Sequence, residues 1–301
     1  APLATMEGSL SSLSHLGTNT HLHLIGPSES IQNFFGEKGV AIPDSITIID
    51  ATEVIGMGEH PVKALQSKPN SSLNVGFSML AKGQLDGFAS AGNSGAVMVA
   101  SFNALKSIPG VSRPCVMGAF PQLNGSYNVV LDVGINVDVK PELLVQFAKL
   151  GAIYSQQVFG VSNPRIGLLN TGEEPGKGSL LYQKTHELLS KTKEFTFTGN
   201  IEARELHDDK VDVVVCDGFT GNVLLKQAEG FYHLIKERNI QDSLLEKFNY
   251  ELYGGTPILG VQGNVILGHG VSSAKAICNM ILATEKIAKA KLSDHITKAF
   301  N

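Results

Sequence analysis

The feature that most constrains the fold of this chain is a short apolar strand that runs through small residues directly into the start of a helix. It spans Asp86 to Ala96 and reads DGFASAGNSGA. Glycine lets the backbone turn tightly, and the first N–H groups of a helix from Asn93 to Lys106 have no intrahelical acceptor. They point at the loop with the positive end of the helix dipole behind them. The stretch therefore predicts either a phosphate site or an ordinary turn capped by Asn93 or Ser94.

The same pattern returns at four other places along the chain. In each, an apolar segment leads into small and polar residues: Val129–Leu131 into Asp132–Asp138, Ile166–Leu169 into Asn170–Gly178, Val211–Val215 into Cys216–Asn222, and Asn264–Leu267 into Gly268–Gly270. In an open parallel sheet the carboxyl ends of the strands share one edge, where ligands bind. We therefore expect the five loops to meet at one crevice.

Helical and strand-like segments alternate along the whole chain, which predicts an α/β fold with a doubly wound, mostly parallel sheet. The chain is treated as one large domain over residues 1–301, or as two lobes, because no linker is visible. The expected strands at the start are His21–Ile25 and Ser45–Ile49. The expected helices are Pro2–Leu16, Ile31–Phe35, Ser72–Lys82, Asn93–Lys106, Pro141–Phe159, Gly178–Ser190, Gly221–Glu237 and Ser272–Lys291.

Two regions depart from this alternation. Residues 108–126 contain short strands and turns, which predicts a hairpin-like excursion or a dimer arm. Residues 231–253 mix apolar side chains with Lys236, Arg238 and Lys247. This second pattern predicts either a protruding amphipathic helical pair that meets a membrane or a partner, or a helix packed on the body of the protein.

Composition narrows the class of protein. With 301 residues, 43% of them hydrophobic, the chain can bury a large core. A net charge of −4 without aromatic and basic residues interleaved argues against nucleic acid as a partner. Cys115, Cys216 and Cys278 are far apart, so we expect neither disulfides nor a zinc site, and a reducing cytoplasm. Because no apolar run reaches the roughly 18 residues of a membrane span, we expect a soluble or peripheral protein, the latter on the inner face of the cell membrane.

Six ordered motifs across the chain resemble those of the PlsX family. They are Ala51–Met57, Ser90–Ala96, Leu131–Asp138, Gly172–Gly178, Val215–Val223 and Tyr253–Val261. The resemblance implies a bacterial phosphate acyltransferase that converts acyl-acyl-carrier protein and inorganic phosphate into acyl phosphate for phospholipid synthesis. It also implies a homodimer, no cofactor, and an α/β/α sandwich like those of isopropylmalate dehydrogenase and phosphotransacetylase.

The chain departs from the family pattern in two places. Family members carry a strand and a Met-Gly-Gly-Asp stretch ahead of the position of Ala1 and Pro2, and a longer helical hairpin around Lys236 to Ile240. We expect both segments to belong to the natural protein and to lie outside the sequence given.

Attack of phosphate on a thioester needs little proton transfer, because phosphate is anionic near neutral pH and a thiolate, with a free pKa of about 8.5, is a tolerable leaving group. The reaction needs a phosphate cradle and a donor for the thioester oxyanion. For the cradle we expect Ser90, Gly92, Asn93, Ser94 and Gly95, with Lys177 neutralising the charge. As oxyanion donors we expect Asn136, Thr220, Asn222 or His269, and as further substrate-binding residues Asp132, Gly134, Gly172, Glu173 and Asp217.

Each of these residues has a structural alternative. Lys177 is also explained as a solvated loop lysine, His269 as a turn residue, and Asn136 and Asn222 as helix caps. The acidic carrier would need a basic patch, for which the candidates are Lys106, Arg113, Lys236, Arg238 and Lys247.

Two other functions compete with acyl transfer. Asp132, Asp138, Glu173, Glu174 and Asp217 would suit a magnesium site in a metal- and NAD-dependent decarboxylating dehydrogenase. That chemistry also needs clustered arginines for a dicarboxylate, whereas the chain has only Arg113, Arg165, Arg204 and Arg238, which are scattered. The remaining alternative is a non-catalytic, anion-binding regulator of lipid synthesis.

Overall fold

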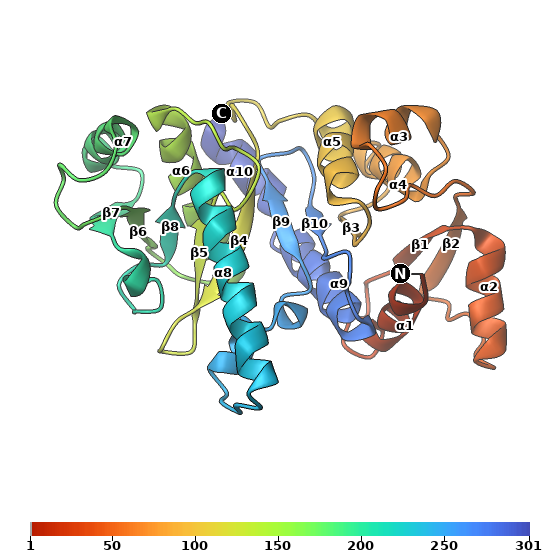
Figure 1. Ribbon diagram of the computed structural model, residues 1–301. Helices are drawn as coiled ribbons and strands as arrows, with labels where there is room; N and C mark the ends of the chain where they lie inside the picture. Colours follow the sequence, from red (N-terminus) through yellow and green to blue (C-terminus); the bar gives the residue numbers. More distant parts are fainter. Residues whose placement is uncertain (1) are drawn as a thin grey trace. The chain divides into compact units, whose positions relative to one another are not determined.

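The computed structural model describes residues 2–301, and the chain divides into two compact units (Figure 1). Unit 1 comprises residues 2–106, 251–256 and 261–289. Unit 2 comprises residues 107–250, 257–260 and 290–301. The chain therefore passes between the units several times, and each unit contains one set of the loops singled out from the sequence.

Unit 1 is built on two pairs of parallel strands. The strands are β1 (Leu22–Gly26) with β2 (Ile46–Asp50), and β3 (Phe88–Ser90) with β10 (Val265–Leu267). Its helices are α1 (Pro2–Ser12), α2 (Ser28–Glu37), α3 (Pro61–Ser67), α4 (Ser72–Ala81), α5 (Ser94–Leu105) and α9 (Ala274–Lys289). Because β3 and β10 are parallel, the loops that follow them leave the same edge.

Unit 2 contains a mixed sheet whose strands lie in the order β9-β4-β5-β8-β6-β7. They are β4 (Cys115–Pro121), β5 (Tyr127–Leu131), β6 (Arg165–Leu169), β7 (Thr196–Ile201), β8 (Val213–Val215) and β9 (Thr256–Leu259). Strands β5 to β8 run parallel, and β4 runs antiparallel to both of its neighbours.

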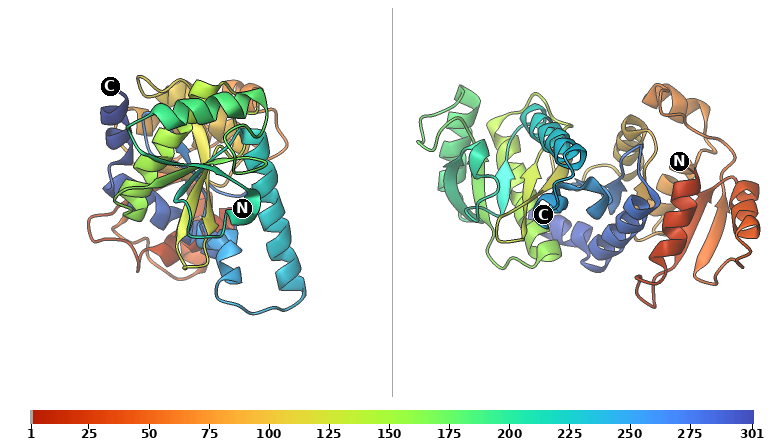
Figure 2. Two further views of the ribbon diagram at one scale, coloured as in Figure 1. Left: turned by 90° about the vertical axis from the view of Figure 1, so that its left-hand side faces the viewer. Right: turned by 60° about the horizontal axis from the view of Figure 1, so that its bottom comes forward.

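Helices cover both faces of this sheet, α6 (Pro141–Phe159) on one face and α8 (Gly218–Glu237) on the other (Figure 2). The remaining elements are α7 (Leu180–Lys191), α10 (Leu292–Phe300) and the 3-10 helices η1 (Ala203–Glu205), η2 (Leu245–Phe248) and η3 (Tyr250–Leu252), of which η3 begins in unit 2 and ends in unit 1. The prediction of a mostly parallel α/β fold is confirmed.

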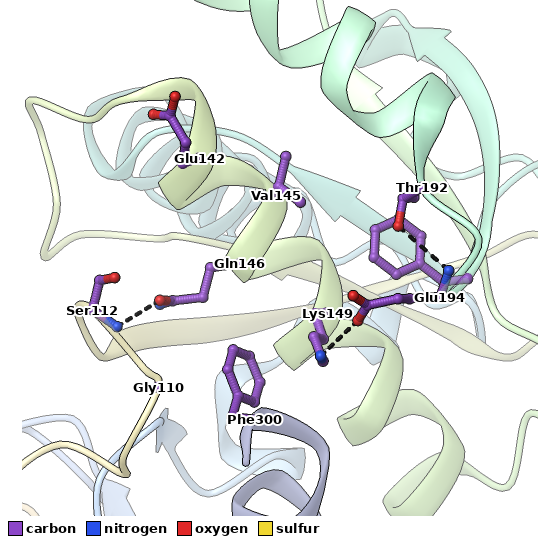
Figure 3. Close-up of a pocket in the computed structure, with 10 residues that line it drawn as sticks. Gly110, Ser112, Glu142, Val145, Gln146, Lys149, Thr192, Glu194 and Phe300 are labelled. Carbon is purple, nitrogen blue, oxygen red and sulfur yellow. Dashed lines mark hydrogen bonds and ion pairs between the residues drawn. The ribbon is translucent and has the colours of Figure 1, made fainter.

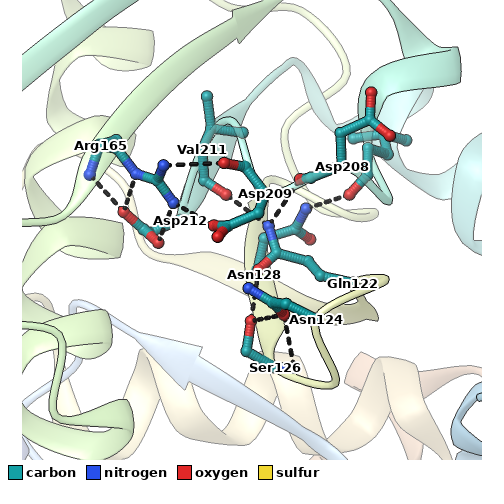
Figure 4. Close-up of polar contacts among 10 residues, drawn as sticks. Gln122, Asn124, Ser126, Asn128, Arg165, Asp208, Asp209, Val211 and Asp212 are labelled. Carbon is teal, nitrogen blue, oxygen red and sulfur yellow. Dashed lines mark hydrogen bonds and ion pairs between the residues drawn. The ribbon is translucent and has the colours of Figure 1, made fainter.

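The hairpin predicted within residues 108–126 exists as β4 and β5, but it lies inside the sheet rather than forming an arm. Six of the seven residues of β4 are buried. Figure 4 shows how the turn is fixed: Gln122 Nε2 donates to the carbonyl oxygens of Val211 (2.7 Å) and Asp208 (3.1 Å). In the same region, Arg165 binds Asp212 and Asp209. The hairpin is therefore part of the sheet rather than an excursion from it, because its apolar strands supply the centre of unit 2.

The segment after α8 packs on this hairpin. Between α8 and β9, the described chain forms the short turns η2 and η3 rather than a second long helix. Lys247 contacts the carbonyl oxygen of Gly125 and lies 5.3 Å from the centre of the Tyr127 ring. Lys236 pairs with Glu246 at 3.2 Å. Two of the three basic residues in the segment are therefore engaged within unit 2.

Candidate functional site

In unit 1, Asn93 ties the start of α5 to the loop that precedes α3. Its side-chain Nδ2 donates to the carbonyl oxygens of Gly56 (3.1 Å), Met57 (3.2 Å) and Glu59 (2.9 Å). Its Oδ1 accepts from the backbone N–H of Ala96 at 3.0 Å, as a helix cap does. Asn93 is 6% exposed, so its side chain fixes the shape of the loop.

The next two residues leave hydrogen-bond donors open at the same helix end. The Ala96 and Val97 N–H groups are taken by the side chain and the carbonyl oxygen of Asn93. Within the described chain, the N–H groups of Ser94 and Gly95 have no acceptor, and the Ser94 side chain is exposed. By contrast, the Gly92 N–H donates to Ser90 Oγ at 3.1 Å. Two N–H groups and one hydroxyl thus remain for an anion.

Gly95 itself is required by packing. A Cβ atom at this position would lie 2.6 Å from Pro61 Cγ, in the first turn of α3. A larger residue at position 95 would therefore displace α3 whether or not an anion binds. This close approach makes Ser94, rather than Gly95, the position at which anion binding can be tested cleanly.

The loop after β10 lies against this site. The Gly268 N–H donates to the carbonyl oxygen of Ser90 at 2.8 Å. The carbonyl oxygen of His269 accepts from Ser272 N (2.9 Å) and Ser272 Oγ (2.6 Å), while the His269 side chain is exposed. Unit 1 therefore places His269 on the loop next to the phosphate-loop candidates Ser90 to Gly95.

In unit 2, Asp132 organises the loop after β5. Its fully buried carboxylate accepts from Val116 N (3.0 Å), Ile135 N (3.2 Å) and Asn136 N (2.6 Å). Asn136 Nδ2 donates both to Asp132 Oδ2 (2.8 Å) and to the carbonyl oxygen of Pro114 (2.9 Å). Both amide hydrogens of Asn136 are engaged, so neither is left for an acyl oxygen.

Asp217 caps α8 in the loop after β8. Its carboxylate accepts from Thr220 N (2.9 Å), Thr220 Oγ1 (2.8 Å) and the Tyr182 hydroxyl (2.6 Å). Burial alone would raise the pKa of Asp217, but these hydrogen bonds hold it below its ordinary value. Tyr182 was missed from the sequence because it lies in the first turn of α7, outside the loops that directly follow the strands.

Asn222, in the first turns of α8, lies close to Gly134 in the loop after β5. Asn222 is exposed, and its Nδ2 donates weakly to the carbonyl oxygen of Val133 at 3.4 Å. Gly134 lies next to it, because a Cβ atom there would approach Asn222 Nδ2 to 3.3 Å. Among the donors expected for the oxyanion, Thr220 is committed to Asp217, whereas Asn222 keeps an exposed amide.

The loop after β6 holds the only lysine among the predicted site residues. Asn170 Nδ2 donates to the carbonyl oxygen of Lys177 at 3.2 Å, and Asn200 Nδ2 to that of Glu174 at 2.8 Å. The Lys177 side chain is 51% exposed, and its Nζ is 3.9 Å from Glu174 Oε2. The loop backbone is therefore tied down, while the ammonium group remains available to a ligand.

The remaining predicted residues of this loop differ in burial. Gly172 is buried, whereas Glu173 is exposed and lies 3.7 Å from Lys210 Nζ. Within residues 2–301, no group of three or more His, Cys, Asp or Glu side chains has a metal-binding arrangement. The carboxylates of Asp132 and Asp217, which the dehydrogenase alternative would use as metal ligands, serve here as acceptors for N–H and O–H groups.

A separate pocket of about 260 Å³ lies beside α6 in unit 2 (Figure 3). Its walls come from α6, α10, the α7–β7 connection and the turn before β4: Gly110, Ser112, Glu142, Val145, Gln146, Lys149, Thr192, Glu194, Phe195 and Phe300. Lys149 pairs with Glu194 at 2.6 Å and lies 4.8 Å from the centre of the Phe300 ring. None of the predicted site residues lines it.

The fold is similar to that of solved phosphotransacetylases. A phosphotransacetylase from Streptococcus pyogenes superposes with a TM-score of 0.68 over 96% of this chain and 92% of that one, at 18% identity. An identity this low shows the fold alone.

The family follows from the sequence comparison. The model of a family described as "Fatty acid synthesis protein" matches residues 1–295, and the chain belongs to this family, the PlsX family that its motifs resemble. A phosphate acyltransferase from Salinibacter ruber is 40% identical over 100% of this chain and 94% of the relative. One from Dictyoglomus turgidum is 38% identical with the same coverage. The resemblance inferred from the six motifs is confirmed.

Proposed function

We propose that this protein is a phosphate acyltransferase that moves a fatty acyl group from the thioester of acyl carrier protein to inorganic phosphate. A phosphate oxygen attacks the thioester carbonyl carbon, a C–O bond forms, the C–S bond breaks, and the carrier leaves as a thiolate. The observation that carries the proposal is the pair of unengaged N–H groups at Ser94 and Gly95, in a chain 40% identical to a phosphate acyltransferase.

The chain supplies a separate group for each need of this reaction. In unit 1, the Ser94 and Gly95 N–H groups and the Ser94 hydroxyl bind the phosphate. In unit 2, the exposed Lys177 ammonium is a cation suited to an anionic group of a substrate. For an acyl oxygen, unit 2 offers the exposed Asn222 amide, whose bond to the carbonyl oxygen of Val133 is long at 3.4 Å. His269, the other expected donor, already uses its ring Nδ1 as an acceptor for the Val271 N–H at 3.5 Å. A single well-placed donor of this kind is typically worth roughly 3 to 4 kcal/mol in the transition state.

The direct test is to incubate the full-length protein with palmitoyl-acyl-carrier protein and phosphate, and to trap acyl phosphate with hydroxylamine. We expect phosphate-dependent formation of the hydroxamate without a nicotinamide cofactor. A nicotinamide-dependent absorbance change would instead support the dehydrogenase. Phosphate binding without turnover would support the regulator.

Docking of an acidic carrier should depend on exposed cations of unit 2 that are not already paired. Lys236 and Lys247 are engaged internally, whereas Arg113 makes only a 3.4 Å bond to the carbonyl oxygen of Asp138 and Arg238 has no ion pair within the described residues. We expect Arg113→Glu/Arg238→Glu to raise the KM for acyl carrier protein and to flatten its salt dependence. An unchanged KM at low salt would move the docking surface elsewhere.

The outer face of α8 and the turn after it carry exposed apolar side chains. Phe231, Leu234 and Ile240 are 55%, 59% and 46% exposed. We propose a homodimeric cytoplasmic protein whose α8 end also makes peripheral contact with the membrane. None of the described helices is long and apolar enough to cross a bilayer.

The two uses of this face can be separated with Leu234→Glu/Ile240→Glu. Leu244 and Leu245 are poorer targets, because they are half-buried and a charge there would disturb packing. Weaker sedimentation with anionic liposomes and an unchanged molar mass by light scattering would support membrane contact. Loss of the dimer with unchanged sedimentation would assign the face to the dimer interface.

A further inference from the structure

Three exposed apolar side chains of unit 1 are carried by the two loops that adjoin the anion-binding end of α5. Val54, Met57 and Val271 are 65%, 58% and 72% exposed. Val54 and Met57 belong to the loop before α3, and Val271 to the loop after β10. Single exposed apolar residues are common on protein surfaces, but a group on loops joined to a polar site indicates a surface that is covered in function.

Met57 connects the loop before α3 with the loop after β10. Its carbonyl oxygen accepts from Asn93 Nδ2 at 3.2 Å, which fixes its backbone to the cap of α5. Its side chain lies directly against Gly270, where an added Cβ atom would overlap Met57 Cε. Gly268, two residues earlier, donates to the carbonyl oxygen of Ser90. The loops of Met57, Ser90 and Val271 therefore form one connected surface.

The charged groups of the Met57 loop are engaged within the protein. Glu53 Oε2 accepts from Asn70 N at 2.7 Å, and Glu59 Oε1 binds Gly56 N (2.6 Å) and Lys68 Nζ (2.5 Å). Lys68 also donates to the carbonyl oxygen of Val54 at 2.7 Å. Both carboxylates of this loop are therefore satisfied within the protein, and the exposed apolar side chains of Val54 and Met57 belong to a loop that is bonded to the electropositive end of α5.

We infer that Met57 and Val271 contact the hydrocarbon chain of the acyl group, beside the phosphate bound at Ser94 and Gly95. An acyl phosphate has an anionic head and an apolar tail, which matches an anion-binding helix end bordered by exposed apolar side chains. This inference rests on the proposed function and names the residues that bind the tail of its substrate and product.

Binding of dodecyl phosphate, an unreactive analogue of the product, tests the inference without relying on turnover. Below its micelle concentration we expect dodecyl phosphate to bind more tightly than inorganic phosphate to the unaltered protein. In Met57→Ala/Val271→Ala, its affinity should fall about three- to tenfold, because apolar area is lost, while that of inorganic phosphate stays unchanged. The single variant Met57→Leu keeps a large apolar side chain and should retain most of the affinity of the unaltered protein for dodecyl phosphate.

A matched control is Leu3→Ala, which truncates a side chain 55% exposed on α1 of the same unit. It should leave both affinities unchanged. In the acyl transfer assay, the double variant should raise the KM for palmitoyl carrier more than that for butanoyl carrier.

The outcomes separate this inference from the proposed function. If the unaltered protein forms acyl phosphate but the double variant affects long and short chains, or both ligands, equally, the inference is overturned and the function stands. If the unaltered protein forms no acyl phosphate from any carrier, the function fails, and the inference about its acyl chain fails with it.

Discussion

Helices α5 and α8 begin in the same way, after a short strand and a loop of small residues, yet their amino ends differ in charge and in open donors. The cap of α5 is the neutral amide of Asn93, whereas the cap of α8 is the carboxylate of Asp217. A carboxylate at a helix amino end neutralises the dipole and repels an anion. Only the α5 end therefore keeps its attraction for phosphate.

The backbone donors follow the same division. At α8, Gly218 N donates to the carbonyl oxygen of Asn136 (2.7 Å), and Thr220 N to Asp217 Oδ1 (2.9 Å). At α5, the N–H groups of Ser94 and Gly95 have no acceptor in the part of the chain that is described. The same strand–loop–helix pattern thus leaves N–H donors open at the start of α5 in unit 1, whereas the donors named at the start of α8 in unit 2 are bonded within the protein.

The largest expected effect comes from disrupting the loop after β5, in which Asp132 holds Asn136 and Asn136 accepts the Gly218 N–H at the start of α8. Asp132→Ala removes the buried acceptor of three backbone N–H groups and of the Asn136 amide. Unsatisfied buried donors are costly, so we expect the free energy of unfolding to fall by roughly 3 to 5 kcal/mol in urea denaturation. The matched control is Asp138→Ala in the same loop, which is exposed and should change stability by less than about 0.5 kcal/mol.

Asp132→Asn then distinguishes the hydrogen bonds from the shape of the side chain. It keeps the volume but replaces one acceptor oxygen with a donor that faces N–H groups. We expect a loss intermediate between Asp132→Ala and the unaltered protein. If the unaltered protein, Asp132→Ala and Asp132→Asn all unfold at the same urea concentration, Asp132 does not hold the loop against the start of α8. The comparison with α5 would then lose its basis.

The sequence was sufficient for the fold and for the position of the loops, because apolar strands and small-residue turns are local patterns. It placed the start of α5 within one residue, since Asn93 is a strong helix cap. It could not tell an open helix end from a closed one, because that depends on partners far along the chain. Tyr182 reaches Asp217 from 35 residues away, and Asn93 reaches Gly56 from 37.

The opposite test closes the open end of α5 by giving it the charge that α8 has. Ser94→Asp places a carboxylate in the first turn of α5, where it complements the helix dipole and occupies the space of the anion. We expect the melting temperature to rise slightly. Phosphate affinity, measured as its KM or by calorimetry, should fall at least tenfold, equal to about 1.4 kcal/mol.

The control for this change is Ser72→Asp, at the first residue of α4 in the same unit. It should give the same small gain in melting temperature and leave the phosphate KM unaltered. If Ser94→Asp kept full phosphate affinity, the anion would bind elsewhere and the open donors of α5 would serve another purpose.

The smallest effect is expected from loosening the cap of α8. Tyr182→Phe removes one hydrogen bond to Asp217 and should cost about 1 kcal/mol near neutral pH. The pKa of Asp217 is lowered in the folded protein, so its contribution to stability is present above its ordinary carboxyl pKa of about 4 and is lost as the pH falls. In the variant that pKa moves back up. The stability deficit should therefore be full at pH 7 and shrink between about pH 5 and 3, and a deficit independent of pH would mean that the Tyr182 hydroxyl acts through packing alone.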